Sequence, residues 1–204
     1  MLLKPSLEEQ KNICSKLITI FDSSFVSFEN RRVLYANFVE TQLGMMLAIC
    51  SETKIYLLEF VDKIGLSDEI KKLKLFLNAN IILCNNVSDK QIFVLLQNEL
   101  TNYFLGNLKE FSIPVELTGT EFQKSAWNQL KLIPYGHTVS YKTQAIALGR
   151  PSAYRAVAGA NSFNKITVII PCHRVVNSNG KLGGYSCGIE RKKWLLNHEK
   201  NCII

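Results

Sequence analysis

A cysteine and a histidine stand side by side at residues 172 and 173, within the run Pro-Cys-His-Arg-Val-Val. A thiol attacks as its thiolate, and a neighbouring imidazole can take its proton. The apolar run Ile166–Ile170 just before the pair predicts a buried strand that would hold it in place. From these residues alone Cys172 is either a nucleophile or a buried structural cysteine, which is the usual fate of a free thiol.

The cysteines as a group suggest neither a disulfide framework nor a zinc cluster. The chain of 204 residues has six cysteines, and none of them forms a Cys-x-x-Cys pair. Such scattered thiols favour a reduced protein. No apolar run approaches the ~20 residues that span a bilayer, and the N-terminus turns acidic, unlike a signal peptide. We therefore expect a cytoplasmic protein without membrane contact.

Charge is unevenly distributed along the chain. The net charge is +7, but residues 1–115 hold 12 Lys and Arg against 13 Asp and Glu, a balance of −1. Residues 116–204 hold 12 Lys and Arg against 4 Asp and Glu, a balance of +8. A basic segment joined to a neutral one is typical of proteins that bind a polyanion such as nucleic acid.

Residues 1–115 predict a small α/β domain. Strands are expected at Arg32–Phe38, Leu43–Ile49, Lys54–Phe60 and Ile81–Leu83, and helices at Leu66–Leu77 and Ser88–Leu105. Ser88 is the expected N-cap of the second helix, with Gln91 completing a capping box. The segment Phe111–Leu117 contains a proline and is expected to be an edge strand or a linker.

Residues 116–204 predict a mainly helical domain. Three helices are expected to begin at a Thr120–Gln123 capping box, at Ser140 and at Pro151, and to end near Pro134, Gly149 and Asn161. The last two of them form either a helix-turn-helix or an ordinary αα-corner. The third is almost all small residues with Arg155 as its only charge, which suits a shallow, sequence-independent contact better than the reading of base edges. A glycine-rich stretch, Gly183–Gly188, is either a mobile lid or a surface loop, and Ile189–Glu199 is the expected last helix.

Seven short motifs lie in register along this second half. They are Gly119-Thr-Glu-Phe-Gln, Ile133-Pro-Tyr-Gly, Ser140-Tyr, Gly149-Arg-Pro-Ser-Ala-Tyr-Arg-Ala-Val, Ile170-Pro-Cys-His-Arg-Val-Val, Gly184-Tyr-Ser and Glu190-Arg-Lys-Lys-Trp-Leu-Leu. In these motifs, over about 85 residues without a gap, the chain resembles the O6-alkylguanine-DNA alkyltransferases, also called methylated-DNA–protein-cysteine methyltransferases. The first half resembles the smaller domain of that family, mainly at Thr41–Phe60, which implies a ribonuclease-H-like sheet flanked by helices.

The resemblance implies a reactive site. Cys172 would accept the alkyl group, His173 would take the thiol proton through a water molecule, and Glu199 would orient His173. Asn164 would be a hinge residue that hydrogen-bonds near the thiol. Tyr141 would push the 3′ phosphate and donate a hydrogen bond to the guanine ring.

The resemblance also implies residues that bind the base and the DNA. Tyr185 and Ser186 would cover the flipped base, and the backbone carbonyls of Cys172 and Val175 would accept hydrogen bonds from its amine. Arg155 would fill the gap that the extruded base leaves. The other expected DNA contacts are Tyr141, Lys142, Arg150, Lys165 and Ser178.

The implied function is DNA repair by irreversible transfer of an alkyl group. A monomer would flip O6-alkylguanine, and also O4-alkylthymine, out of duplex DNA through the minor groove and move the alkyl group to Cys172. The thioether is stable, so each molecule would act once, with no cofactor and no metal. All three histidines lie at or after His137, so the N-terminal zinc site of some family members is not expected.

Two residues depart from the family pattern. Lys165 follows Asn164 where most members have proline, and we expect a less rigid hinge there. Cys187 stands two residues after Tyr185, where we expect a thiol at the pocket rim that narrows the pocket or forms a disulfide with Cys172 on oxidation.

Three alternative functions remain open at this point. A non-catalytic reader of alkylated DNA would share the fold but lack the cysteine. A helix-turn-helix regulator would need more hydrogen-bonding side chains on the third helix. A cysteine hydrolase using Cys172 and His173 would need an oxyanion hole and room for hydrolytic water.

Overall fold

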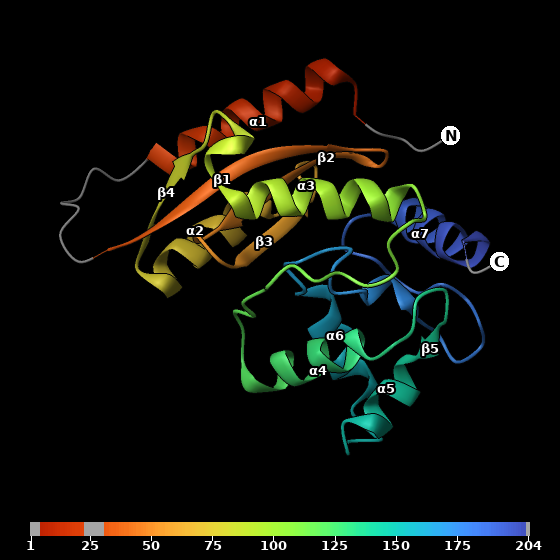
Figure 1. Ribbon diagram of the computed structural model, residues 1–204. Helices are drawn as coiled ribbons and strands as arrows, with labels where there is room; N and C mark the ends of the chain where they lie inside the picture. Colours follow the sequence, from red (N-terminus) through yellow and green to blue (C-terminus); the bar gives the residue numbers. More distant parts are fainter. Residues whose placement is uncertain (1–4, 23–30, 203–204) are drawn as a thin grey trace. The chain divides into compact units, whose positions relative to one another are not determined.

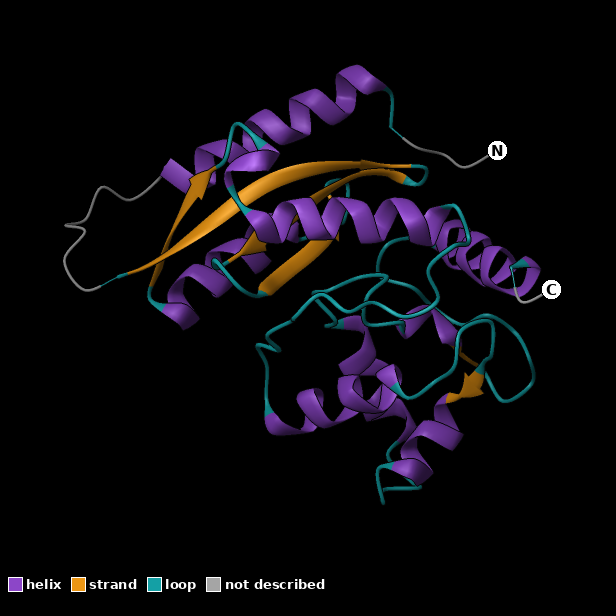
Figure 2. Ribbon diagram, in the orientation of Figure 1, coloured by secondary structure: helices purple, strands orange, loops and turns teal. Residues whose placement is uncertain are grey.

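The computed structural model describes residues 5–22 and 31–202 (Figure 1). These residues divide into two compact units. The first holds the described residues up to 102 together with 112–116, and the second holds 103–111 and 117–202. Figure 2 shows a first unit rich in regular structure and a second unit in which long loops connect short helices. Within the described ranges, no helix is long and apolar enough to cross a membrane.

The first unit is a four-stranded sheet with helices. Its elements are α1 Leu7–Asp22, β1 Arg32–Thr41, β2 Gly44–Cys50, β3 Ile55–Phe60, α2 Leu66–Leu77, β4 Ala79–Leu83, the 3-10 turn η1 Val87–Asp89 and α3 Gln91–Phe104, whose last two residues belong to the second unit. The strand order is β3-β2-β1-β4. β1 pairs antiparallel with β2 and parallel with β4, and β2 pairs antiparallel with β3.

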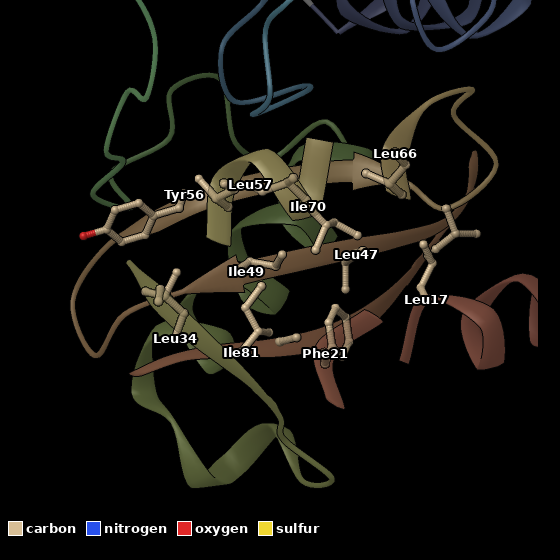
Figure 3. Close-up of a cluster of buried hydrophobic side chains, with 14 of the residues drawn as sticks. Leu17, Phe21, Leu34, Leu47, Ile49, Tyr56, Leu57, Leu66, Ile70 and Ile81 are labelled. Carbon is tan, nitrogen blue, oxygen red and sulfur yellow. The ribbon is translucent and has the colours of Figure 1, made fainter. Parts of the chain in front are cut away.

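The core of the first unit lies between the sheet and two helices. Figure 3 shows side chains of α1, such as Phe21, and of α2, such as Ile70, directed toward Ile49 and Ile81 of the sheet. Met46, Ala48 and Cys50 of β2 are also buried although they lie outside this cluster. Burial of both alternating sets explains why β2 is a continuous apolar run and not an alternating one.

Most elements predicted for the first unit are confirmed, and one is wrong. The strands and α2 lie where the apolar periodicity places them, with β1 three residues longer than expected. Ser88 does not cap a helix, because it lies inside η1, where its backbone N–H donates to the side chain of Asn86. The helix starts only at Gln91. The segment Phe111–Leu117 is a linker with a single bridge, from Val115 to β3.

The second unit is mainly helical, and the predicted fold class is confirmed. Its elements are α4 Glu121–Lys131, β5 Val139–Ser140, α5 Tyr141–Ala147, α6 Tyr154–Ser162, the 3-10 turn η2 Cys172–Arg174, β6 Val175–Val176 and α7 Ile189–Asn201. The capping box forms at Thr120 and Gln123 as predicted. Ser140 caps α5, which Gly149 ends with a φ of 69° that favours glycine. α5 and α6 pack together as the expected helix-turn-helix pair.

The second unit differs from the sequence prediction in the start of one helix and in one expected strand. Pro151 lies in a turn closed by a hydrogen bond from Ala153 N–H to the Arg150 carbonyl, so α6 starts at Tyr154. The apolar run Ile166–Ile170 is buried, but it folds as turns and not as a strand. A hydrogen bond from Ile170 N–H to the Ile166 carbonyl, 2.9 Å long, closes the run on itself. Val168 takes a φ of 75° there, which is unusual for a β-branched residue.

Candidate active site

Asn164 connects the end of α6 to the cysteine. Its side-chain nitrogen donates to the carbonyl of Ile170 at 2.9 Å and to Sγ of Cys172 at 3.3 Å. Its side-chain oxygen accepts from the backbone N–H of Ile166 at 3.0 Å. One amide side chain therefore holds both ends of the buried turn and contacts the thiol, as expected for Asn164. Cys172 itself is only 6% exposed.

His173 and Glu199 form a fully buried pair. Nε2 of His173 lies 2.8 Å from Oε1 of Glu199, and both side chains are 0% exposed. A carboxylate only accepts, so Nε2 is the nitrogen that carries the proton. Nδ1 makes no hydrogen bond within the described residues. Burial lowers the pKa of His173, although the hydrogen bond and charge of Glu199 oppose the shift. The imidazole is thus held neutral, with Nδ1 as its proton acceptor.

Glu199 accepts hydrogen bonds from three residues in addition to His173. Arg174 donates from Nε to Oε2 at 2.9 Å and from Nη2 to Oε1 at 3.0 Å. The hydroxyl of Tyr103 donates to Oε1 at 2.8 Å, and Gly136 N–H donates to Oε2 at 3.0 Å. Burial alone would raise the pKa of Glu199, but the hydrogen bonds and charges of His173 and Arg174 hold it well below its ordinary value. The carboxylate therefore stays ionised.

Lys192 is a buried ammonium beside the cysteine. The residue is 0% exposed, and Nζ donates to the carbonyls of Val175 at 2.6 Å and Gly184 at 3.3 Å. Burial lowers the pKa of Lys192 to about 8, and negative charge on the Cys172 sulfur opposes that shift. The Val175 carbonyl, expected to bind the guanine amine, thus already accepts one hydrogen bond.

A pocket of about 510 Å³ opens above Cys172. Its lining consists of Tyr141, Tyr154, Arg155, Ala158, Asn161, Ser162, Cys172, Asn177, Gly184, Tyr185 and Ser186. Burial and nearby charge on Cys172 raise the pKa of Tyr141, so its phenol keeps the proton that it would donate. The structure therefore brings Tyr141, Arg155, Tyr185 and Ser186 together around the thiol.

Three other predicted residues do not line this pocket. Lys142, Arg150 and Ser178 are exposed on the surface of the second unit. Their placement is compatible with contacts to a phosphate backbone, which remain predictions.

Cys187 and Lys165 differ from what the sequence suggested. Cys187 is 3% exposed and absent from the pocket lining; its sulfur lies 3.5 Å from the hydroxyl of Thr167. It therefore does not narrow the rim. Nζ of Lys165 donates to the carbonyl of Thr118 at 2.5 Å and to its hydroxyl at 3.2 Å. This link anchors the hinge, so the expected loosening is offset, and it engages the amine that was expected to contact DNA.

Sequence reasoning missed three contributors to the site. Tyr103 lies far from the motifs in the sequence, and only the folded chain brings its hydroxyl to Glu199. Arg174 and Lys192 stand inside motifs that were noted, but nothing in their spacing shows which carboxylate or carbonyl they bind. A charged residue within an otherwise buried motif is the one signal that could have pointed to them.

The fold and the site together define a class of protein. A basic helical unit with a helix-turn-helix pair holds a buried cysteine under a pocket large enough for a nucleobase, and the adjacent His173 pairs with Glu199. Comparison with known proteins then gives the family. A model described as the 6-O-methylguanine DNA methyltransferase DNA binding domain matches residues 121–201, and one described as the ribonuclease-like domain of the same enzyme matches residues 34–117. The chain belongs to this family of methylated-DNA–protein-cysteine methyltransferases.

Individual relatives agree with the family models. A methylated-DNA–protein-cysteine methyltransferase of Methanosarcina barkeri is 38% identical over 168 residues, covering 82% of this chain and 98% of that protein. One from Mycobacterium bovis is 49% identical over 104 residues, covering 51% of this chain and 63% of that protein.

Solved structures show the same likeness. The crystal structure of Mycobacterium tuberculosis O6-methylguanine methyltransferase matches with a TM-score of 0.69 and 33% identity over 82% of this chain and 93% of that one. The M. tuberculosis OGT in complex with DNA matches with a TM-score of 0.68 and 31% identity, over 83% of this chain and 94% of that one.

Proposed function

We propose that this protein repairs duplex DNA by moving an alkyl group from O6 of guanine to Sγ of Cys172. The observation that carries the proposal is the chain of contacts from Asn164 to the thiol and from His173 to Glu199, placed under a pocket that Tyr141 lines. The nucleophile, its base and the orienting carboxylate have the relationship of a hydrolytic triad, applied here to alkyl transfer.

The reaction needs one proton transfer at each end. The thiol proton passes to Nδ1 of His173 through a water molecule, and Glu199 stabilises the resulting imidazolium. The thiolate forms a bond to the alkyl carbon as the bond from that carbon to O6 breaks. The electron pair moves into the guanine ring, which takes a proton from the hydroxyl of Tyr141. The products are an S-alkylcysteine and an unmodified guanine.

The alkylated base must first leave the double helix, because its O6 substituent is hidden there. Extruding a nucleotide costs a few kcal/mol. In this proposal Arg155 offsets that cost by filling the vacated space from the minor groove, while Tyr185 and Ser186 cover the flipped base. Lys142, Arg150 and Ser178 hold the phosphates. The protein acts as a monomer, and O4-alkylthymine is a second substrate.

One transfer uses up one molecule of the protein. The carbon–sulfur bond of the thioether is stable, because breaking it would require the expulsion of a thiolate from an unactivated alkyl carbon. Each molecule therefore repairs one lesion.

Mass spectrometry tests the proposal directly. The protein is incubated with a duplex carrying O6-methylguanine, and the expected result is a single, stoichiometric gain of one methyl group on the peptide that contains Cys172. Cys172→Ser is the matched control and should bind the duplex without gaining mass. Binding of the duplex by the wild type without any gain would show a reader of alkylated DNA and not an enzyme.

A further inference from the structure

Tyr154 is a large side chain on a helix that is otherwise built from small residues. α6 reads Tyr-Arg-Ala-Val-Ala-Gly-Ala-Asn-Ser. Tyr154 is the first residue of this helix, is 43% exposed, and lines the pocket that contains Cys172. The guanidinium carbon of Arg155 lies 5.7 Å from the centroid of its ring. An exposed aromatic ring and a cation therefore stand together at the solvent-facing side of the pocket.

The position of the ring is hard to explain by packing alone. The core of this helix is supplied by Val157 and Ala160, which are almost fully buried. Tyr154 and Arg155 are exposed beside them and line the cavity instead. In proteins that bind nucleic acids, exposed aromatic side chains stack on bases that have lost a stacking neighbour. They do so without sequence preference, because every base has a π face.

Base flipping creates such bases. When a nucleotide leaves the helix, each of its two neighbours loses a stacking partner. We propose that the ring of Tyr154 stacks on a base that borders the flipped nucleotide while Arg155 fills the vacated space, so that the two side chains form one wedge. This inference rests on the proposed function, because it assumes that α6 meets DNA at an extruded base.

Three substitutions separate stacking from bulk and from the hydroxyl. Tyr154→Phe keeps the ring, Tyr154→Leu keeps an apolar side chain without a π face, and Tyr154→Ala removes both. Phe163→Ala is a matched control, because Phe163 is a 56% exposed aromatic residue at the other end of α6 that does not line the pocket.

The experiment measures single-turnover transfer from a duplex carrying O6-methylguanine and from free O6-benzylguanine, with each duplex affinity measured in a Cys172→Ser background. Tyr154→Ala and Tyr154→Leu should lower duplex affinity and the duplex transfer rate on the order of tenfold, which corresponds to one lost stacking contact. Transfer from the free base should stay unchanged, and Tyr154→Phe and Phe163→Ala should match the wild type.

Distinct outcomes would overturn the inference. Wild-type duplex rates for Tyr154→Leu would show that bulk alone is needed, and equal losses on both substrates would place Tyr154 against the flipped base. A wild-type protein that transfers from neither substrate would instead refute the proposed function itself.

Discussion

Replacing Tyr103 with phenylalanine removes one atom from the hydrogen-bond network of Glu199. The Tyr103 hydroxyl and Nε2 of His173 both donate to Oε1, each at 2.8 Å. The ring packs edge-on against Tyr135, with centroids 5.9 Å apart, and against His198 at 5.5 Å, and phenylalanine would keep both contacts. The substitution therefore isolates the hydroxyl. Tyr103 is a positioning residue in this view, since it acts on the thiol only through Glu199 and His173.

The loss has two measurable consequences. A buried hydrogen bond to a charged group contributes about 1.5–3 kcal/mol, so Tyr103→Phe should lower the free energy of unfolding by that order. Removing a donor also concentrates negative charge on the oxygen that faces His173, which raises the pKa of His173. If neutral His173 takes the thiol proton, the rate falls as the pH drops through that pKa, and the variant should lose activity at a higher pH than the wild type.

Two assays measure the free energy of unfolding and the pKa of His173. Both tryptophans, Trp127 and Trp194, belong to the second unit, so their fluorescence in urea reports the stability of the unit that holds the site. Single-turnover transfer from O6-benzylguanine against pH reports His173. Tyr56→Phe in the first unit is the matched control. Urea curves and pH profiles that superimpose on the wild type would refute the role of Tyr103, and a pH profile unchanged despite lost stability would leave it purely structural.

The other predictions concern DNA and charge. Arg155→Ala should slow repair of a duplex about tenfold or more, since base flipping costs a few kcal/mol, and should spare free O6-benzylguanine; equal losses would contradict this. Duplex affinity should fall with salt with a log–log slope of about −2, if Lys142 and Arg150 are the cationic phosphate contacts; a slope near zero would exclude them. Glu199→Gln leaves Arg174 uncompensated and should cost about 3–5 kcal/mol of stability. The pKa of Glu199 is lower in the folded protein than the unfolded carboxyl pKa of about 4.3. The ionised carboxylate therefore stabilises the wild type above the unfolded pKa, and this stabilisation is lost as the pH falls. Urea curves of the Gln variant should change less between about pH 5 and 3.

Helix ends that are set by residues close together in the sequence could be predicted from it. The capping box at Thr120 and Gln123 involves four consecutive residues, and the end of α5 at Gly149 needs only a residue that tolerates positive φ. Ser88 shows the limit of such signals, because Asn86, two residues earlier, offers a competing cap and takes the backbone N–H of Ser88 instead.

Features that depend on distant contacts were not readable. Hydropathy predicted correctly that Ile166–Ile170 is buried, but a buried run forms a strand only if another strand pairs with it along its length. Here the side chain of Asn164 satisfies the ends of the run and a turn results. The hydroxyl of Tyr103 reaches Glu199 across 96 positions of sequence, and no local pattern predicts that distance.

The burial of Glu199 explains how such a site can exist in a folded protein. An isolated carboxylate in this setting would be protonated, and it could not then stabilise an imidazolium. Five hydrogen bonds from four residues keep it ionised, and the guanidinium of Arg174 balances its charge. His173 consequently faces an ion pair and not a lone anion, so that burial lowers the pKa of its ring, the charge of Arg174 adds to this shift, and Glu199 only partly opposes it. It can therefore rest as a neutral base and still gain a well-oriented partner when it takes a proton. Arg174 and Tyr103 therefore act on the site through Glu199, although neither lines the pocket.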